Sequence, residues 1–264
     1  SWMTRIIEGL VPADSRGSLE EAKGPKGVGT DLTTEPVGTG PFEFEEWQTG
    51  SHVHMTAFDD HWREDVPHVD EFRFEIVVEA SSRLSQLRSG SSDMMKRVPA
   101  KDFEALESES GVTAESVPGA RTLVTYTNLV DNGENPMSNV HNRRAVLHSV
   151  PTNEIVERVF RGQAIPQTGP WFPDSEWTSP ELKEMELYDL NQAQAELEQG
   201  PSPDGFEVEL MTENVAYMMD SAEIIQNNLS QIGVDVEIVT LEKSALFDRL
   251  YGNIGWELAL NDWT

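Results

Sequence analysis

The chain has 264 residues, of which 47 are acidic and 19 basic, so its formal net charge at pH 7 is −28. A charge of this size and sign repels the phosphates of nucleic acid and the headgroups of an anionic membrane, which excludes both as expected partners. The chain has no Cys, which excludes thiol nucleophiles, thiolate metal sites and disulfides.

The acidic residues are spread along the chain instead of forming a tail, and only 6 of the 19 basic residues are Lys. This composition is typical of proteins that work in very high salt, where the Debye length falls to about 3 Å at 1 M and the mutual repulsion is screened. An ordinary acidic protein is the alternative. We expect a halophilic protein whose stability rises with salt.

Residues 11–40 are rich in Gly, Pro, Ser and Thr and show little periodicity, which predicts an irregular approach to the first regular element. The amino-terminal residues lack the charged and apolar regions of a signal peptide, and no apolar run reaches about 18 residues. A chain of this length can bury roughly 70–75% of its unfolded surface, enough for one large or two medium domains.

Apolar residues alternate with polar ones on both sides of the turn-forming residues 48–51, which predicts a hairpin over residues 42–57. A third strand is expected over residues 72–78. A helix with one apolar side follows over residues 80–89 and is expected to end at Gly90. This first part therefore reads as a mixed sheet with helices.

Residues 122–126 form a further extended segment, and we place the crossing between two domains there. Two short helices are expected over residues 145–148 and 155–160. The Pro- and Trp-rich residues 169–180 are expected to form a loop that packs through its aromatic rings.

The last quarter of the sequence alternates between strand and helix patterns. Asp189 is expected to begin a helix that Gly200 ends, and apolar residues from Met218 to Ile232 recur at helical spacing. Such alternation predicts an α/β layer with parallel neighbouring strands. The remaining elements expected here are strands over 206–210, 234–238 and 256–260 and a helix over 245–250. The predicted domains are thus residues 1–122, with a mixed sheet and helices, and residues 123–264, with α/β structure.

Motifs for catalysis or metal binding are weak in this sequence. Gly38-Thr39-Gly40 lacks the following Lys and the strand and helix of a phosphate-binding loop. His52 and His54 alternate on the polar face of the predicted hairpin, where solvation is expected rather than a metal site with His61 and His68. Nothing resembles a nucleophile elbow or a catalytic triad. We expect no cofactor, no metal and no enzymatic activity.

Several segments, taken together and in order, resemble one family. Residues 36–42 read Pro-Val-Gly-Thr-Gly-Pro-Phe, and residues 142–166 carry an Arg-Ala helix, an Ile-Val helix and a Gly-x-Ala-x-Pro exit. These segments are similar to those of family 5 extracellular solute-binding proteins of ABC transporters, the oligopeptide- and dipeptide-binding type. The further matching positions are Trp47, His61-Trp62, 89–93, Tyr188-Asp189, Ala193, Gly205-Phe206, Gln226, Leu229 and 232–234. The departures are His61, where Tyr is usual, and residues 149–152, where many relatives carry Ala-Ile-Asp-Arg.

The resemblance implies an α/β fold of the type II periplasmic-binding-protein kind, with two lobes of mixed sheets flanked by helices. It also implies a monomer that captures peptides between the lobes outside the cell and delivers them to the permease subunits of an importer. Anchoring to the membrane or to a lipid, through a segment absent from this chain, is implied as well. The match corresponds to the middle of family members about twice as long, so we expect that these residues alone do not bind peptide.

Four residues are predicted to contact the ligand. Trp263 follows the last expected strand, and ligands of α/β sheets bind beyond the carboxyl ends of the strands; the resemblance places a Trp beside the pocket there too. The resemblance also implies ligand contacts for Tyr126 and Asn128 at the crossing between lobes. Trp171 is a further candidate. Plain core packing is the alternative for each aromatic residue.

Other functions remain open at this point. A secreted hydrolase on an acidic scaffold would require two carboxylates that converge in one cleft with raised pKa values. A cell-surface interaction module would use the acidic face and need no cleft between lobes. Within the family, a nickel chelate, a sugar or another small solute could replace the peptide.

Overall fold

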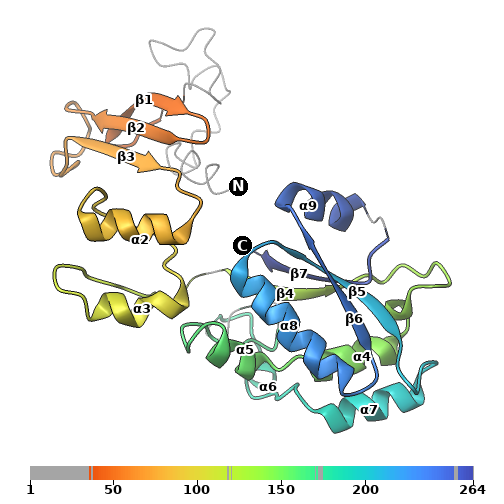
Figure 1. Ribbon diagram of the computed structural model, residues 1–264. Helices are drawn as coiled ribbons and strands as arrows, with labels where there is room; N and C mark the ends of the chain where they lie inside the picture. The colour runs from red at the N-terminus through yellow and green to blue at the C-terminus, as the bar shows by residue number, and fades with distance from the viewer. Residues whose placement is uncertain are drawn as a thin grey trace. The chain divides into compact units, whose positions relative to one another are not determined.

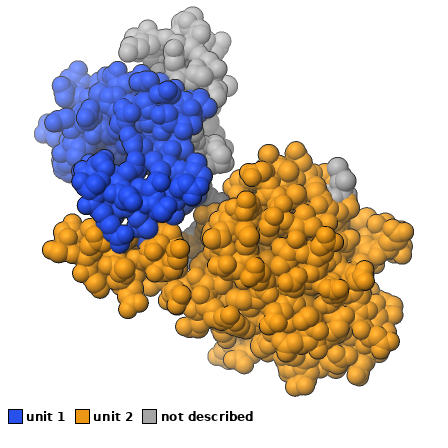
Figure 2. Space-filling view, in the orientation of Figure 1, with its two compact units in different colours: residues 1–98 blue, residues 99–264 orange. Residues whose placement is uncertain are grey.

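The computed structural model describes residues 36, 38–117, 119, 121–169, 171, 175–252 and 255–263, with only the backbone of Trp263. The chain forms two compact units, residues 1–98 and 99–264 (Figure 2). The irregular segment expected over residues 11–40 falls mostly outside the described residues. None of the described helices is both long enough and apolar enough to cross a membrane.

The first unit contains a three-stranded antiparallel sheet in the order β1-β2-β3. Strand β1 spans Phe42–Gln48, β2 spans His52–Ala57 and β3 spans Glu71–Glu75. Gly50 adopts a φ of 75° in the turn between β1 and β2, a conformation that glycine reaches without strain. The predicted hairpin is therefore confirmed, whereas the third strand ends at Glu75 instead of residue 78.

Helix α2, Ala80–Ser89, follows the small sheet and buries Leu84. Gly90 ends the helix in the left-handed conformation, with a φ of 71°, and its N–H bonds back to carbonyls of the last turn. The predicted end of this helix is confirmed. Arg83 donates from Nη1 to the carbonyl oxygens of Val77 and Val78 at 2.8 and 2.6 Å, which holds the chain just before the helix.

The second unit is built from seven α-helices, one 3₁₀ helix and four strands over its described residues (Figure 1). Its strands are β4 Thr122–Thr127, β5 Glu207–Glu213, β6 Asp235–Leu241 and β7 Leu258–Trp263. The helices are α3 Ala100–Glu107, η1 Pro136–Ser138, α4 Val140–Ser149, α5 Thr152–Arg158, α6 Pro180–Lys183, α7 Leu190–Gln199, α8 Ala216–Ser230 and α9 Lys243–Gly252.

The four strands form one mixed sheet in the order β4-β7-β5-β6. Strand β5 pairs in parallel with both β6 and β7, and β4 pairs antiparallel with β7. The parallel neighbours predicted from the alternating pattern are confirmed. Helix α8 makes the connection from β5 to β6, as the crossover between parallel strands requires.

Both faces of this sheet are covered. One face carries the larger core, in which α4, α5, α7 and α8 pack against β5, β6 and β7 (Figure 1). The other face carries a smaller cluster of Met211, Leu246, Trp256 and Ala259, which α9 covers. Because helices lie on both faces of the sheet, the architecture is the helix–sheet–helix layering of α/β proteins.

Helix α8 shows why the larger core forms. Its apolar stripe of Met218, Ala222, Ile225 and Leu229 is fully buried, and burying each large side chain stabilises the fold by about 1.5–3 kcal/mol. Two glycines then let the segments that lead into β5 and β6 approach each other. Gly205, before β5, and Gly233, after α8, have φ values of 102° and 81°. A Cβ on Gly205 would lie only 1.9 Å from the carbonyl oxygen of Gly233.

Candidate functional site

The candidate site lies at the carboxyl edge of the second sheet, where the parallel strands end. Glu213 of β5 and Leu241 of β6 are paired neighbours at this edge. Trp263 ends β7 beside Thr122, the first residue of the antiparallel strand β4. Ligands of open α/β sheets bind beyond this edge, and the backbone of Trp263 lies at it, as the last residue of β7 and not beyond the strand as expected.

A hydrogen-bonded carboxylate holds this edge together. Asp262, on β7, has a side chain that is only 12% exposed and forms an ion pair with Arg121, which directly precedes β4. The hydroxyl of Tyr217, in the first turn of α8, donates to Asp262 Oδ2 at 2.6 Å. The ring of Phe160, beyond α5, lies 5.7 Å from the ring of Tyr217. Four segments distant in sequence are thus joined at one point.

The chemistry of Tyr217 follows from its surroundings. Burial raises the pKa of its hydroxyl far above the usual value, and the hydrogen bond to Asp262 and the charge of that carboxylate raise it further. The positive charge of Arg121 opposes this effect. Tyr217 therefore stays protonated at neutral pH and acts as a hydrogen-bond donor, a role that requires no proton transfer.

Tyr126 lies well away from the carboxyl edge. It pairs with Ala259, four residues before Trp263 on β7, which corresponds to about 13 Å along the strand. The half-buried side chain packs against the cluster under α9 that contains Trp256 and Leu246. The pKa of Tyr126 is raised, first by burial and then by the electrostatic effect of Tyr251 and Asp262.

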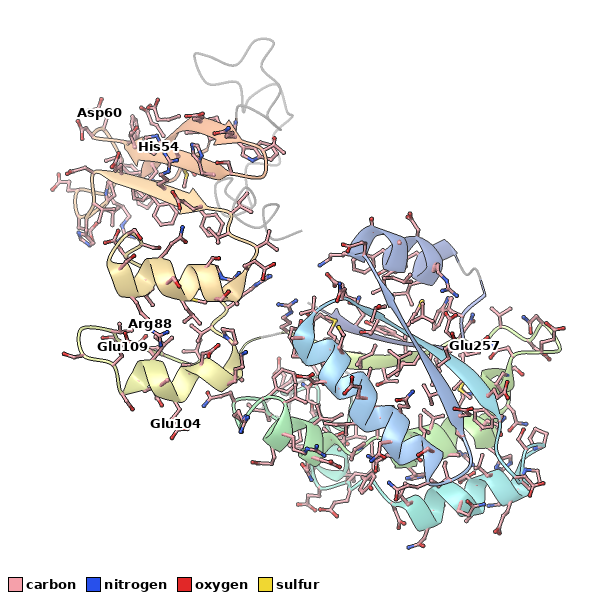
Figure 3. The ribbon with its side chains drawn as sticks, in the orientation of Figure 1. His54, Asp60, Arg88, Glu104, Glu109 and Glu257 are labelled. Atoms are coloured by element: carbon pink, nitrogen blue, oxygen red, sulfur yellow. The ribbon has the colours of Figure 1, made fainter. Side chains whose placement is uncertain are left out.

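Asn128 follows β4 at the opposite, amino edge of the parallel strands. Its side chain is buried, with Nδ2 donating to the carbonyl of Trp256 at 2.9 Å and Oδ1 accepting from the N–H of Val130 at 3.0 Å. Its backbone N–H bonds to the carbonyl of Glu257, which Figure 3 labels at this side of the sheet. Both polar ends of the side chain thus anchor the loop that follows β4.

Trp171 lies in the long connection between α5 and α6. Trp171 is 44% exposed, and its carbonyl oxygen accepts a hydrogen bond from Thr178 Oγ1 at 3.4 Å. Of the four predicted contact residues, the structure brings Tyr126 and Asn128 together around Trp256. It does not bring that pair to the end of β7, where Trp263 lies.

The residues that tie the carboxyl edge, Arg121, Tyr217 and Asp262, were missed as site candidates in the sequence. One signal could have found them. Asn261 and Asp262 interrupt the otherwise apolar residues 258–263, which read as a buried strand, and a buried carboxylate needs partners. Arg121 immediately before β4 is the kind of cation that such a carboxylate requires.

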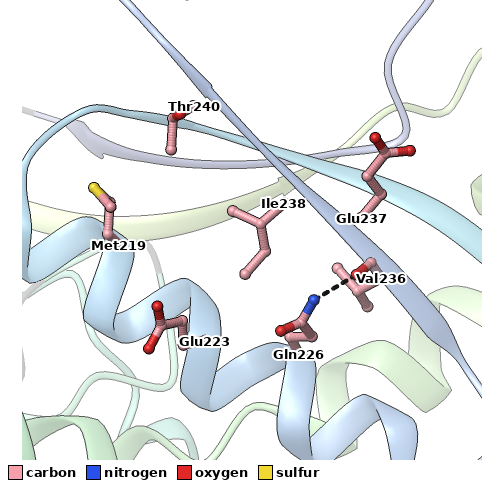
Figure 4. A pocket seen from close by; sticks show the side chains of 7 residues that line it. All are labelled: Met219, Glu223, Gln226, Val236, Glu237, Ile238 and Thr240. Atoms are coloured by element: carbon pink, nitrogen blue, oxygen red, sulfur yellow. Dashed lines mark hydrogen bonds between the residues drawn. The ribbon is translucent and has the colours of Figure 1, made fainter.

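Two hollows in the described part of the second unit lie elsewhere. The larger, of about 600 Å³, runs between α8 and the edge strand β6, where Gln226 Nε2 donates to the carbonyl of Val236 at 2.6 Å (Figure 4). The smaller, of about 430 Å³, lies beside the loop after β4 and includes Asn135 and Phe206. Neither hollow is lined by any of the four predicted contact residues.

His52 and His54 in the first unit are held by local contacts. His52 is only 5% exposed, so the solvated position expected for it is wrong; Ser51 Oγ lies 3.0 Å and Arg73 Nη2 3.3 Å from its Nδ1. His54 on β2, labelled in Figure 3, lies 3.2 Å from the carboxylate of Glu71. Among the described residues, no group of three or more His, Asp or Glu is arranged to hold a metal ion.

The chain is similar in sequence to proteins that are named for binding small peptides. The di/tripeptide-binding protein 1 of Pseudomonas aeruginosa is 26% identical over 88% of this chain and 44% of its own length. The dipeptide-binding protein of Escherichia coli is 25% identical over 82% of this chain and 40% of its own. This chain therefore spans less than half the length of these curated relatives.

Solved structures show the same fold. The periplasmic binding protein DppA of Helicobacter pylori, in complex with the peptide STSA, matches with a TM-score of 0.74 and 26% identity over 87% of this chain and 44% of that one. NikA of Staphylococcus aureus, in complex with Ni(L-His)2, matches with a TM-score of 0.73 over 90% of this chain and 50% of that one; at 19% identity this likeness concerns the fold alone. The predicted α/β fold of the type II periplasmic binding proteins is confirmed.

The family model described as "Bacterial extracellular solute-binding proteins, family 5 Middle" matches residues 5–264, nearly the whole chain. The match covers both compact units and every described element of the second sheet. The chain therefore belongs to family 5 of the bacterial extracellular solute-binding proteins.

Proposed function

We propose that the complete protein is the solute-binding component of an ABC importer and that its solute is a peptide, either a dipeptide or an oligopeptide. The observation that carries this proposal is the match, at 26% identity and a TM-score of 0.74, to the H. pylori periplasmic binding protein in complex with the peptide STSA. The relatives from P. aeruginosa and E. coli are named for di- and tripeptides. Binding would favour a closed form through its differential affinity for two conformations, with no covalent step and hence no enzymatic activity.

The proposed peptide crevice borders the carboxyl edge of the second sheet. Trp263, whose backbone ends β7 at this edge, is the proposed contact there. Tyr126, Asn128 and Trp171 are further proposed contacts, although Tyr126 and Asn128 lie toward the amino edge of the parallel strands. Asn128 is the weakest of these on physical grounds, because a ligand that took its amide would leave the carbonyl of Trp256 or the N–H of Val130 without a partner.

The proposed boundary between the lobes lies at residues 122 and 123. The compact units separate earlier, at Val98 and Pro99, but the second sheet and its core begin only with β4. The proposed location is outside the cell, on a membrane or lipid anchor carried by another part of the protein. The proposed partners are the membrane permease subunits, and we propose that the protein acts as a monomer.

Mass spectrometry of solutes that co-purify with the complete protein tests the proposal. We expect peptides of a few residues, released when the protein is denatured and exchanged when excess peptide is added. A nickel chelate, a sugar or a nonpeptide solute in their place would assign a different ligand within the family. Hydrolysis of added peptides during the same incubation would contradict the transport role and favour a hydrolase.

A further inference from the structure

Asp262 occupies a position where an apolar side chain would fit. Strand alternation places it on the same face of β7 as Leu258 and Leu260, which are 0% and 1% exposed in the larger core. Burial of a carboxylate is unfavourable unless partners satisfy it, and Asp262 has two, Arg121 and the hydroxyl of Tyr217. An apolar residue would pack here without that requirement. It would not make the directional contacts that tie β7 to Arg121 and Tyr217.

The two partners belong to the segments that surround the end of β7. Arg121 precedes Thr122, which pairs directly with Trp263. Tyr217 lies in the first turn of α8, and its ring contacts Phe160 beyond α5. The carboxylate therefore sets the distance from the last residues of β7 both to the start of β4 and to the start of α8.

We propose that Asp262 is a positioning residue for the peptide crevice. Through Arg121 and Tyr217 it holds the carboxyl end of β7, and so the backbone that presents Trp263, in one place before the peptide arrives. Because preorganised contacts avoid the ordering cost of binding, this restraint raises affinity without touching the peptide. The inference rests on the proposed function.

The decisive comparison removes, in the complete protein, one of two tyrosine hydrogen bonds, each of which involves a residue of α8. Tyr217→Phe removes the bond to Asp262, whereas Tyr188→Phe removes a similar bond, 2.7 Å long, to Asn228 near the other end of the helix. We expect both variants to melt at lower temperatures than the unmodified protein. Only Tyr217→Phe should also weaken peptide binding, by about tenfold, while Tyr188→Phe should stay within about twofold.

Two substitutions of Asp262 remove its contacts partly or completely and so test how peptide affinity depends on them. Asp262→Asn keeps an oxygen that can accept from Tyr217 but loses the charge that pairs with Arg121, whereas Asp262→Leu removes both interactions. We expect affinity to fall in the order unmodified, Asp262→Asn, Asp262→Leu. Equal peptide affinity in all these proteins, with only the melting temperature lowered, would show a structural role alone and overturn the proposal.

Hydrogen exchange on the 264-residue chain separates this inference from the proposed function. If the complete protein binds none of the peptides tested, the proposed function fails, and exchange decides whether the edge is restrained. We expect faster exchange of the amides of residues 122–124 and 260–263 in Asp262→Leu, and no such change in Tyr188→Phe. Unchanged exchange at these amides would overturn the positioning role.

Discussion

Glu196 is a buried carboxylate whose ionised form is stabilised by His141. The two side chains lie 2.8 Å apart between α4 and α7, and Arg144 lies 3.8 Å from the other carboxylate oxygen. The hydrogen bond from His141 lowers the pKa of Glu196 below the ordinary value of 4.5, with a further contribution from Arg144, while burial acts in the opposite direction. The charged form is therefore favoured in the folded state.

This shift makes stability depend on pH in a defined direction. Because the folded pKa of Glu196 is lower than its unfolded value, its contribution is fully present above about pH 4.5 and is lost as the pH falls through the folded pKa. Thermal melts of the unmodified chain and of Glu196→Gln between pH 6 and pH 3 measure this. We expect the gap between their melting temperatures to shrink below about pH 4.5; a gap that stays constant over this range would contradict the assignment.

Gly205 is constrained by a backbone contact. It combines a φ of 102° with a position where an added Cβ would lie 1.9 Å from the carbonyl oxygen of Gly233. We expect Gly205→Ala to destabilise the fold by about 3 kcal/mol or more, because both the strained dihedral and the clash must be relieved. Gly162→Ala is the control, since Gly162 has a φ of 74° and open space around it; its cost should be about 1 kcal/mol. Similar denaturation midpoints for the two variants would show that the close contact between Gly205 and Gly233 adds nothing to the destabilisation.

At the scale of elements, α7 depends on Asp189, the residue that caps its start. Asp189 accepts hydrogen bonds from the N–H groups of Asn191 and Gln192 at 2.9 and 3.1 Å, two donors that would otherwise lack a partner at the helix start. We expect Asp189→Ala to destabilise the fold by about 1 kcal/mol, and Asp189→Asn to cost much less because it keeps the accepting oxygen. Urea denaturation compares the two, and equal losses would show that the cap contributes through its charge and not through these hydrogen bonds.

The sequence predicted most elements that follow a local rule. The helix stop at Gly90, the cap at Asp189 and the alternation from β5 to α8 to β6 depend on residues close to one another in sequence. The last strand was placed over residues 256–260, whereas β7 spans Leu258–Trp263. Both faces of β7 are buried, so its apolar residues do not reveal the register.

Features set by distant segments were not predictable from local patterns. Helix α3 was missed because it is only 8 residues long, and Leu106 is its one buried hydrophobic side chain. The antiparallel pairing of β4 with β7 joins residues more than 130 positions apart, and no turn or spacing signals it. The Arg121, Tyr217 and Asp262 contact is of the same kind, since its three members converge only once the sheet has formed.

At the scale of the whole molecule, the charge of −28 is the dominant property. We propose that the protein is halophilic and expect its melting temperature to rise between 0.1 M and 2 M KCl, because salt screens the repulsion among 47 carboxylates. Sucrose at matched osmolality is the control, since it is excluded from protein surfaces but screens no charge. An unchanged or lower melting temperature in KCl would remove the halophilic interpretation.

Calorimetric titration of the complete protein with di-, tri- and tetrapeptides tests the central claim, that the carboxyl edge of the second sheet forms a wall of a peptide site. We expect at least one peptide to bind with a Kd near 1 μM or below, about −8 kcal/mol. Trp263→Ala should weaken that binding by about tenfold or more, whereas Trp177→Ala, at a residue that is 71% exposed and outside the proposed site, should leave it unchanged. Absence of peptide binding, or the same affinity in Trp263→Ala as in the unmodified protein, would contradict the account.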